Sequence, residues 1–204
     1  MISIRKYLGP LNKENPVLIQ ILGICSALAV TAQLKPAIVM TISVTVVCAI
    51  GNFIISLFRK TIPPRIRIIV QLVVVAALVI LVDMILQAYV YDISKMLSVY
   101  VGLIITNCIL MGRIEAFALS NKPLPSLIDG IANGLGYGMV LVVIGFTREL
   151  LANGTIWNQQ VLPTALYAHG YMNNGLMALP PMALILLGVL IWIQRSTRLN
   201  PDTK

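Results

Sequence analysis

The chain has 204 residues, of which 58% are hydrophobic and 11% are charged, and its mean hydropathy is +0.91. Soluble domains carry about twice this fraction of charged residues, so the composition excludes a conventional soluble enzyme. The formal net charge of +8 at pH 7 is the only bulk property shared with nucleic-acid-binding proteins, and the positions of the basic residues explain it differently.

Six hydrophobic segments are expected to cross a membrane. A hydrocarbon core of about 30 Å requires about 20 mostly apolar residues in a helical span. The segments lack the period-two alternation of a barrel strand, so helices are the expected spanning element. They cover approximately residues 17–34, 37–58, 68–90, 97–111, 126–151 and 175–193. The sequence therefore predicts an all-α integral membrane protein, with residues 1–204 forming a single membrane domain.

The basic residues fall mainly on one side of these spans. With the N-terminus in the cytoplasm, all but three of the 15 Lys and Arg residues lie in cytoplasmic segments. The three exceptions are Lys35, Lys95 and Arg148. This asymmetry is the one described by the positive-inside rule. It predicts that both termini face the cytoplasm, and it leaves no reason to expect nucleic acid as a partner.

The first and fourth segments are short, interrupted hydrophobic runs, and each carries a cysteine near its end. The first contains Cys25 and stops at Lys35-Pro36, and the fourth contains Cys108 and stops at Gly112-Arg113. Short, broken segments at corresponding places in two halves of a membrane protein indicate a site near the bilayer midplane. We therefore expect each cysteine to lie at the tip of a half-helix.

The two halves of the chain form a predicted inverted repeat. Three spans in each half, at about residues 15–92 and 96–193, make the halves run in opposite directions through the bilayer. Each cysteine is followed 26 residues later by a glycine beside an asparagine, Gly51 after Cys25 (51 − 25) and Gly134 after Cys108 (134 − 108). A twofold axis in the membrane plane then predicts that the two thiols meet near the bilayer centre.

A soft thiolate is a preferred ligand of iron–sulfur centres and of other soft metals. Cys25 and Cys108 are therefore candidate ligands of a redox centre at membrane depth. Two thiolates are too few for a cluster, which predicts a partner that supplies the others. Cys48 lies in the middle of the second segment without a matching feature in the other half, and we expect it to be a small buried hydrophobic residue.

Several longer strings carry a specific resemblance to a known family. They are LGICSALAVT at 22–31, YDISK at 91–95, VGLIITNCI at 101–109, MGR at 111–113, EAFA at 115–118, IDG at 128–130 and NGLGYG at 133–138. These strings resemble the D subunits of sodium-translocating NADH:quinone oxidoreductases, over residues 15–151 and again around 174–177. The related E subunits of Rnf ferredoxin:NAD oxidoreductase complexes share the Thr-Asn-Cys and Arg-x-Glu-Ala-Phe-Ala runs.

The resemblance implies a multi-pass subunit of a sodium-translocating NADH:quinone reductase in the bacterial cytoplasmic (inner) membrane, not catalytic alone. It implies a homologous, oppositely inserted six-helix E subunit, which with this chain supplies four cysteines to an intramembrane iron–sulfur centre. On this chain the implied ligands are Cys25 and Cys108, and a [2Fe–2S] cluster and a single iron both remain open.

The same resemblance implies a place in an electron path. NADH is oxidised by the F subunit, and the B and C subunits carry flavins, while quinone is bound elsewhere in the six-subunit complex. The shared centre is expected to relay electrons from the cytoplasmic side to a covalently bound flavin on the opposite side, coupled to Na⁺ export.

Two acidic residues are candidates for an ion path. Asp83 lies about two-thirds along the third segment among apolar neighbours, where a carboxylate is costly. It is either a sodium or proton relay or a residue hydrogen-bonded to a partner subunit. Asp129 precedes the glycine-rich fifth segment and is either a second relay or a residue in interfacial water. Glu115 follows Cys108 by seven residues, which on a helix uninterrupted at Gly112 places both on one face.

Gly130, Gly134 and Gly138 recur at a spacing of four in the fifth segment. A nucleotide-binding loop is excluded because no strand precedes them and no Gly-Lys-Ser/Thr follows. The spacing instead predicts close packing against another helix in lipid.

A second function class remains open at this point. The chain is alternatively a subunit of a secondary ion or solute transporter, whose inverted repeat surrounds a midplane site and whose cysteines are incidental. The iron content of the complex separates the two hypotheses.

Overall fold

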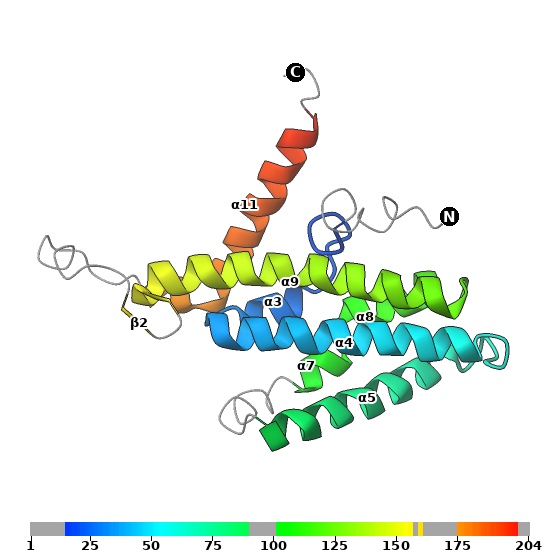
Figure 1. The fold of residues 1–204 in the computed structure, drawn as a ribbon. Helices are drawn as coiled ribbons and strands as arrows, with labels where there is room; N and C mark the ends of the chain where they lie inside the picture. The colour runs from blue at the N-terminus through cyan, green and yellow to red at the C-terminus, as the bar shows by residue number, and fades with distance from the viewer. Residues whose placement is uncertain (1–14, 90–100, 157–158, 161–174, 200–204) are drawn as a thin grey trace, which may run out of the picture.

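The computed structural model describes residues 15–89, 101–156, 159–160 and 175–199, and this part of the chain is almost entirely helical (Figure 1). The helices are α3 (Ile24–Val30), α4 (Leu34–Phe58), α5 (Arg67–Tyr89), α7 (Val101–Ile105), α8 (Cys108–Arg113), the π-helix η1 (Ile114–Ala118), α9 (Pro123–Asn153), the 3-10 helix η2 (Gly175–Ala178) and α11 (Pro180–Leu199). Two strands of two residues each, β1 (Thr155–Ile156) and β2 (Gln159–Gln160), pair antiparallel after α9.

Three helices of the described residues are long and apolar enough to cross a membrane. They are α4, most of α5 (Arg67–Ile85) and most of α9 (Pro123–Ala152). The apolar part of α11 (Pro180–Ser196) is shorter. The two cysteine-bearing runs form short helices: α3 has seven residues, and the fourth run is divided between α7 with five and α8 with six.

The core of the fold is an antiparallel pair of helices, α4 and α9, which lie side by side in Figure 1. Three glycines of α9 face residues of α4, and the pairs run in opposite directions along the two helices: Gly130 with Ala49, Gly134 with Thr45, and Gly138 with Thr41. A Cβ atom at Gly134 would lie 2.7 Å from the Thr45 Cα atom. The absent side chains therefore let the two backbones touch, and the predicted close packing of this glycine row is confirmed.

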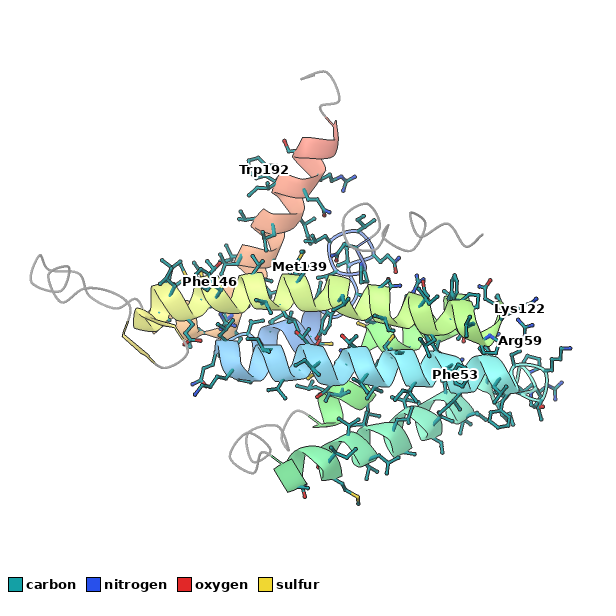
Figure 2. All side chains as sticks on the ribbon, in the orientation of Figure 1. Phe53, Arg59, Lys122, Met139, Phe146 and Trp192 are labelled. Atoms are coloured by element: carbon teal, nitrogen blue, oxygen red, sulfur yellow. The ribbon has the colours of Figure 1, made fainter. Side chains whose placement is uncertain are left out.

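Hydrogen bonds fasten the α4–α9 pair at both ends. At one end the Ser56 hydroxyl donates to the Asn121 carbonyl over 2.6 Å, and Arg59 donates to the Ser120 carbonyl over 3.2 Å. Figure 2 shows Arg59 and Lys122 together at this end. At the opposite end a Glu149 carboxylate oxygen accepts the Leu34 amide over 2.6 Å, which satisfies one of the open donors at the start of α4.

Large apolar side chains cover the outside of the fold. Phe53, Met139, Phe146 and Trp192, labelled in Figure 2, are all exposed, and Trp192 is 69% exposed. Helix α5 is predominantly apolar, yet only 17% of its most hydrophobic window is buried. An outer surface of this kind is stable against hydrocarbon chains or other membrane helices rather than against water.

Candidate functional site: the cysteine pair

The two candidate ligands lie in the first turns of short helices. Cys25 is the second residue of α3, and Cys108 is the first residue of α8. Helix α8 begins there because Asn107 caps it, with its side-chain oxygen accepting the Ile109 amide over 3.2 Å. Helix α3 begins after Gly23, which adopts a left-handed conformation with φ of 83°.

The structure brings the two thiols together from positions 83 residues apart (108 − 25). The thiol of Cys108 lies beside the start of α3, within electrostatic range of the Cys25 thiol. The Cys108 sulfur also accepts the Gly23 amide over 2.7 Å. Cys25 is exposed and Cys108 is half-buried, so the pair faces the outside of the isolated chain.

Cys48 lies apart from this pair, fully buried in the middle of α4. Its sulfur is 4.0 Å from the side-chain nitrogen of Asn52, one turn along the same helix. The expectation that Cys48 is a small buried hydrophobic residue is confirmed.

The connection that leads into α3 is strained. Ile21 has φ of 57°, and for a branched L-residue the left-handed region costs about 1–2 kcal/mol. At Gly23 a Cβ atom would lie 2.7 Å from Ile109 Cδ1 and 3.0 Å from Tyr137 Cε2, so both the φ angle and the space require glycine. Strain of this kind persists where the surrounding structure enforces it, and it concentrates at functional sites.

A buried hydrogen-bonded network lies directly behind the cysteines. The hydroxyl groups of Ser26 and Tyr137 are 2.6 Å apart, and the Asn107 side-chain nitrogen lies 3.5 Å from each of them. Ser26 also donates to the Gly23 carbonyl over 3.0 Å. No local sequence pattern identified this network, although an asparagine directly before Cys108 is a helix-capping signal that could have found one of its members.

Asp129 belongs to a buried ion pair next to α8. Arg113 donates to its two carboxylate oxygens over 3.0 and 2.5 Å, and Asn133 donates to the same carboxylate over 3.1 Å. The side chains of Arg113 and Asp129 are 15% and 6% exposed. Asp129 is therefore buried within the chain rather than open to solvent at the start of α9, and its expected role as an ion relay stays a prediction.

Asp83 lies on a different element, α5. One carboxylate oxygen accepts the Gln87 side-chain amide over 2.9 Å, and the other is buried without a hydrogen-bond partner among the described residues. Glu115 lies in η1, directly after α8, where it pairs with Arg67 and accepts the Gln71 side-chain amide over 3.0 Å. The acids singled out from the sequence therefore do not form one cluster with the cysteines in the described part of the chain.

Arg148 is an additional buried charge, only 1% exposed. Its guanidinium donates to the Thr31 hydroxyl over 2.7 Å and to the carbonyls of Met177 and Leu179 over 3.1 and 3.2 Å. It therefore joins the end of α3 to the start of α11. These contacts come from segments far apart in the chain, so no local sequence pattern predicted them.

The residues present suit one half of an iron–sulfur ligand set. Two soft sulfur atoms lie at one site, one of them accepts a backbone N–H, and the other is exposed on the surface of the isolated chain. Within the described ranges, no group of three or more His, Cys, Asp or Glu side chains gathers in a way that could hold a metal ion. A complete site therefore requires ligands from outside this part of the chain.

Comparison with known proteins identifies the family of the chain. Residues 4–191 match the family model described as "Rnf-Nqr subunit, membrane protein". The chain belongs to the Rnf-Nqr family. Its membership makes it a multi-pass membrane protein, in agreement with the three apolar helices long enough to cross a bilayer.

Three relatives from Shewanella share much of the sequence of this Rnf-Nqr chain. Proteins of S. piezotolerans and S. pealeana are each 54% identical to it, and one of S. halifaxensis is 53% identical. Each comparison covers 188 residues, which are 92% of this chain and 90% of the relative. All three relatives are named as the D subunit of a Na(+)-translocating NADH-quinone reductase.

Proposed function

We propose that the chain is the D-type membrane subunit of a bacterial Na⁺-translocating NADH-quinone reductase, where it contributes Cys25 and Cys108 to an iron–sulfur centre shared with a homologous subunit. One observation carries the proposal: the Cys108 sulfur accepts the amide of Gly23, two residues before Cys25, so cysteines from opposite halves of the chain lie at one site. The names of the relatives support the assignment to this complex.

The exposure of the cysteines supports a shared site. Ser26, next to Cys25 in the chain, is fully buried, whereas Cys25 itself is exposed. A ligand that must be joined by two thiolates of another subunit has to be reachable from that subunit. When bound, the centre supplies one-electron transfer, and this chain holds, orients and shields it on one side.

An inverted repeat accounts for the pairing of the cysteines. In the proposed arrangement, residues 15–92 and 96–193 are the two halves of a single six-span membrane domain, and α3 and α8 are corresponding half-helices. The antiparallel course of α4 and α9, one from each half, supports this symmetry. Both termini are then on the cytoplasmic side of the inner membrane, together with the end of the fold that carries Arg59 and Lys122.

The shared centre is proposed to relay electrons from the NADH-oxidising F subunit toward the flavin-bearing B and C subunits, coupled to Na⁺ export. Asp83 and Asp129 are the candidate ion-path residues on this chain. The unpartnered carboxylate oxygen of Asp83 supports its candidacy, whereas Asp129 is already neutralised by Arg113. Flavins, NADH and quinone are bound by the other subunits.

The test is the iron and acid-labile sulfide content of the purified complex with Cys25→Ser. We expect the loss of one iron centre and of quinone reduction, because an alcohol is a poor ligand for iron in such a centre. Cys48→Ser is the matched control, since Cys48 is also a membrane-embedded thiol but lies in another part of the fold. Unchanged iron stoichiometry in Cys25→Ser would contradict the redox role and favour the transporter alternative.

A further inference from the structure

We propose that Tyr137 is a positioning residue for the cysteine pair, and that its hydroxyl group sets how the two thiols face each other by joining Ser26 to Asn107. The proposal rests on the proposed function only where it assigns the thiols to a shared iron centre. The hydrogen-bonded network itself contains no metal ligand and can be tested without iron.

The three members of the network come from three separate elements. Ser26 lies in α3, Asn107 in the link between α7 and α8, and Tyr137 in α9, and each is 0% exposed. Their polar atoms lie 2.6 to 3.5 Å apart. A fully buried polar network is costly unless its members are satisfied, and when satisfied it selects one arrangement of the elements that carry it.

Each contact of Tyr137 is one residue away from a cysteine. Ser26 follows Cys25 in the first turn of α3, and Asn107 precedes Cys108 as the cap of α8. A shift of the tyrosine hydroxyl group is therefore transmitted to both thiols through a single peptide unit on each side. The anchor point is α9, which the glycine row holds firmly against α4.

The tyrosine ring reaches the cysteines by a second route. A Cβ atom at Gly23 would lie 3.0 Å from Tyr137 Cε2, so the ring packs against the glycine whose amide donates to the Cys108 sulfur. The ring of Tyr137 therefore acts on the cysteine site by packing, and its hydroxyl group acts by hydrogen bonding, so the two effects can be tested separately. Tyr137→Phe keeps the packing and removes only the hydroxyl.

The test measures how readily the two thiols are bridged in the absence of metal. The full chain carrying Cys48→Ala is treated in membrane vesicles with a chelator and a reductant, and the Cys25–Cys108 cross-link formed by dibromobimane is followed by fluorescence. Tyr137→Phe and Ser26→Ala are each expected to slow cross-linking about fivefold, the effect of losing one hydrogen bond. The double variant should be slowed by less than the product of the two single effects, because both changes delete the Ser26–Tyr137 bond.

Ser43→Ala is the matched control, since Ser43 is a buried serine on α4 outside the network. A cross-linking rate for Tyr137→Phe equal to that of Ser43→Ala would overturn the proposal and leave the tyrosine with a packing role. If Tyr137→Phe does not accumulate, Ser26→Ala decides the question, because it removes the same bond from the α3 side.

A second measurement separates this proposal from the proposed function. In the intact complex, Tyr137→Phe should retain the iron but shift the midpoint potential and the electron paramagnetic resonance spectrum of the centre, whereas Ser43→Ala should change neither. Slowed cross-linking in a complex that contains no iron centre would refute the iron assignment while upholding the positioning role. An unchanged spectrum and potential in Tyr137→Phe would overturn the positioning role while leaving the iron assignment intact.

Discussion

At the scale of single residues, the three cysteines differ in their surroundings rather than in their chemistry. Cys25 and Cys108 adjoin buried polar side chains and each other, whereas Cys48 is enclosed in α4. The distinction was predictable because two of the cysteines lie in interrupted hydrophobic runs and the third does not. The role of Tyr137 was not predictable, because its partners are 111 and 30 residues away in the chain and no local pattern links them.

Charged residues show the same limit of local prediction. Asp129 was singled out from the sequence, but its partner Arg113 is 16 residues away and no local pattern links the two. Removing one member of a buried pair leaves an uncompensated charge, at a cost of about 3–5 kcal/mol. The half-exposed pair of Arg67 and Glu115 contributes about 1 kcal/mol or less.

Replacing Gly23 should disturb the cysteine site through backbone conformation and lack of space, without removing either thiol. In Gly23→Ala, the φ of 83° and the contact with Ile109 force the segment to move, with an expected destabilisation of about 1–2 kcal/mol. The movement also withdraws the amide from the Cys108 sulfur, so iron occupancy of the purified complex should fall together with its thermal stability. Gly102→Ala is the control, because a Cβ atom at Gly102 meets nothing within 4 Å. Equal behaviour of the two variants would contradict this account.

At the scale of elements, the sequence predicted the long helices and the broken ones for different reasons. The bounds of α4, α5 and α9 follow from uninterrupted apolar runs, and they lie within a few residues of the expected spans 37–58, 68–90 and 126–151. The interruption of the fourth run was expected at Gly112. It lies instead at Thr106-Asn107, because the asparagine side chain caps a new helix there. Gly112 remains helical, and the chain continues through η1.

The row of glycines on α9 provides a test at this scale. Gly134→Ala would bring a Cβ atom to 2.7 Å from the Thr45 backbone, so the helices must separate, and we expect a loss of about 1–3 kcal/mol from overpacking. Gly188→Ala on α11 is the control. A Cβ atom at Gly188 meets nothing within 4 Å. This variant should therefore unfold with the same free energy as the unmodified protein or a slightly higher one, because alanine favours helix more than glycine does. The measurement is the free energy of unfolding of the protein in a detergent titration, and similar values for both variants would refute close packing as the reason for the glycines.

At the scale of the whole molecule, the fold has two chemically different ends. One end gathers Arg59, Lys60 and Lys122, and the opposite end has Lys35 with the internally bonded Arg148 and Glu149. This difference between the two ends was predictable from the sequence, because it follows from counting the basic residues in the segments between apolar runs. The steep departure of α11 from the other helices, visible in Figure 1, was not, because its contacts come from α3 and α9, which lie far from it in the chain.

The orientation in the membrane can be measured with a thiol reagent that does not cross lipid. Lys60→Cys and Lys122→Cys should be labelled from the cytoplasmic face only, and Gln33→Cys, exposed at the other end of α4, from the outer face only. The unmodified chain gives the background from its native cysteines. Labelling of Lys60→Cys from outside would reverse the orientation and with it the proposed direction of the electron path.

The contact between α4 and α9 restricts how this protein can move. Two backbones that interlock glycine against threonine and alanine cannot slide by a small amount, because the next matching register is a full helical turn of about 5.4 Å away. Any displacement of α4 against α9 would therefore be a discrete step rather than a gradual slide. The interlocked pair forms a rigid base, and the short cysteine-bearing helices α3 and α8 pack against it.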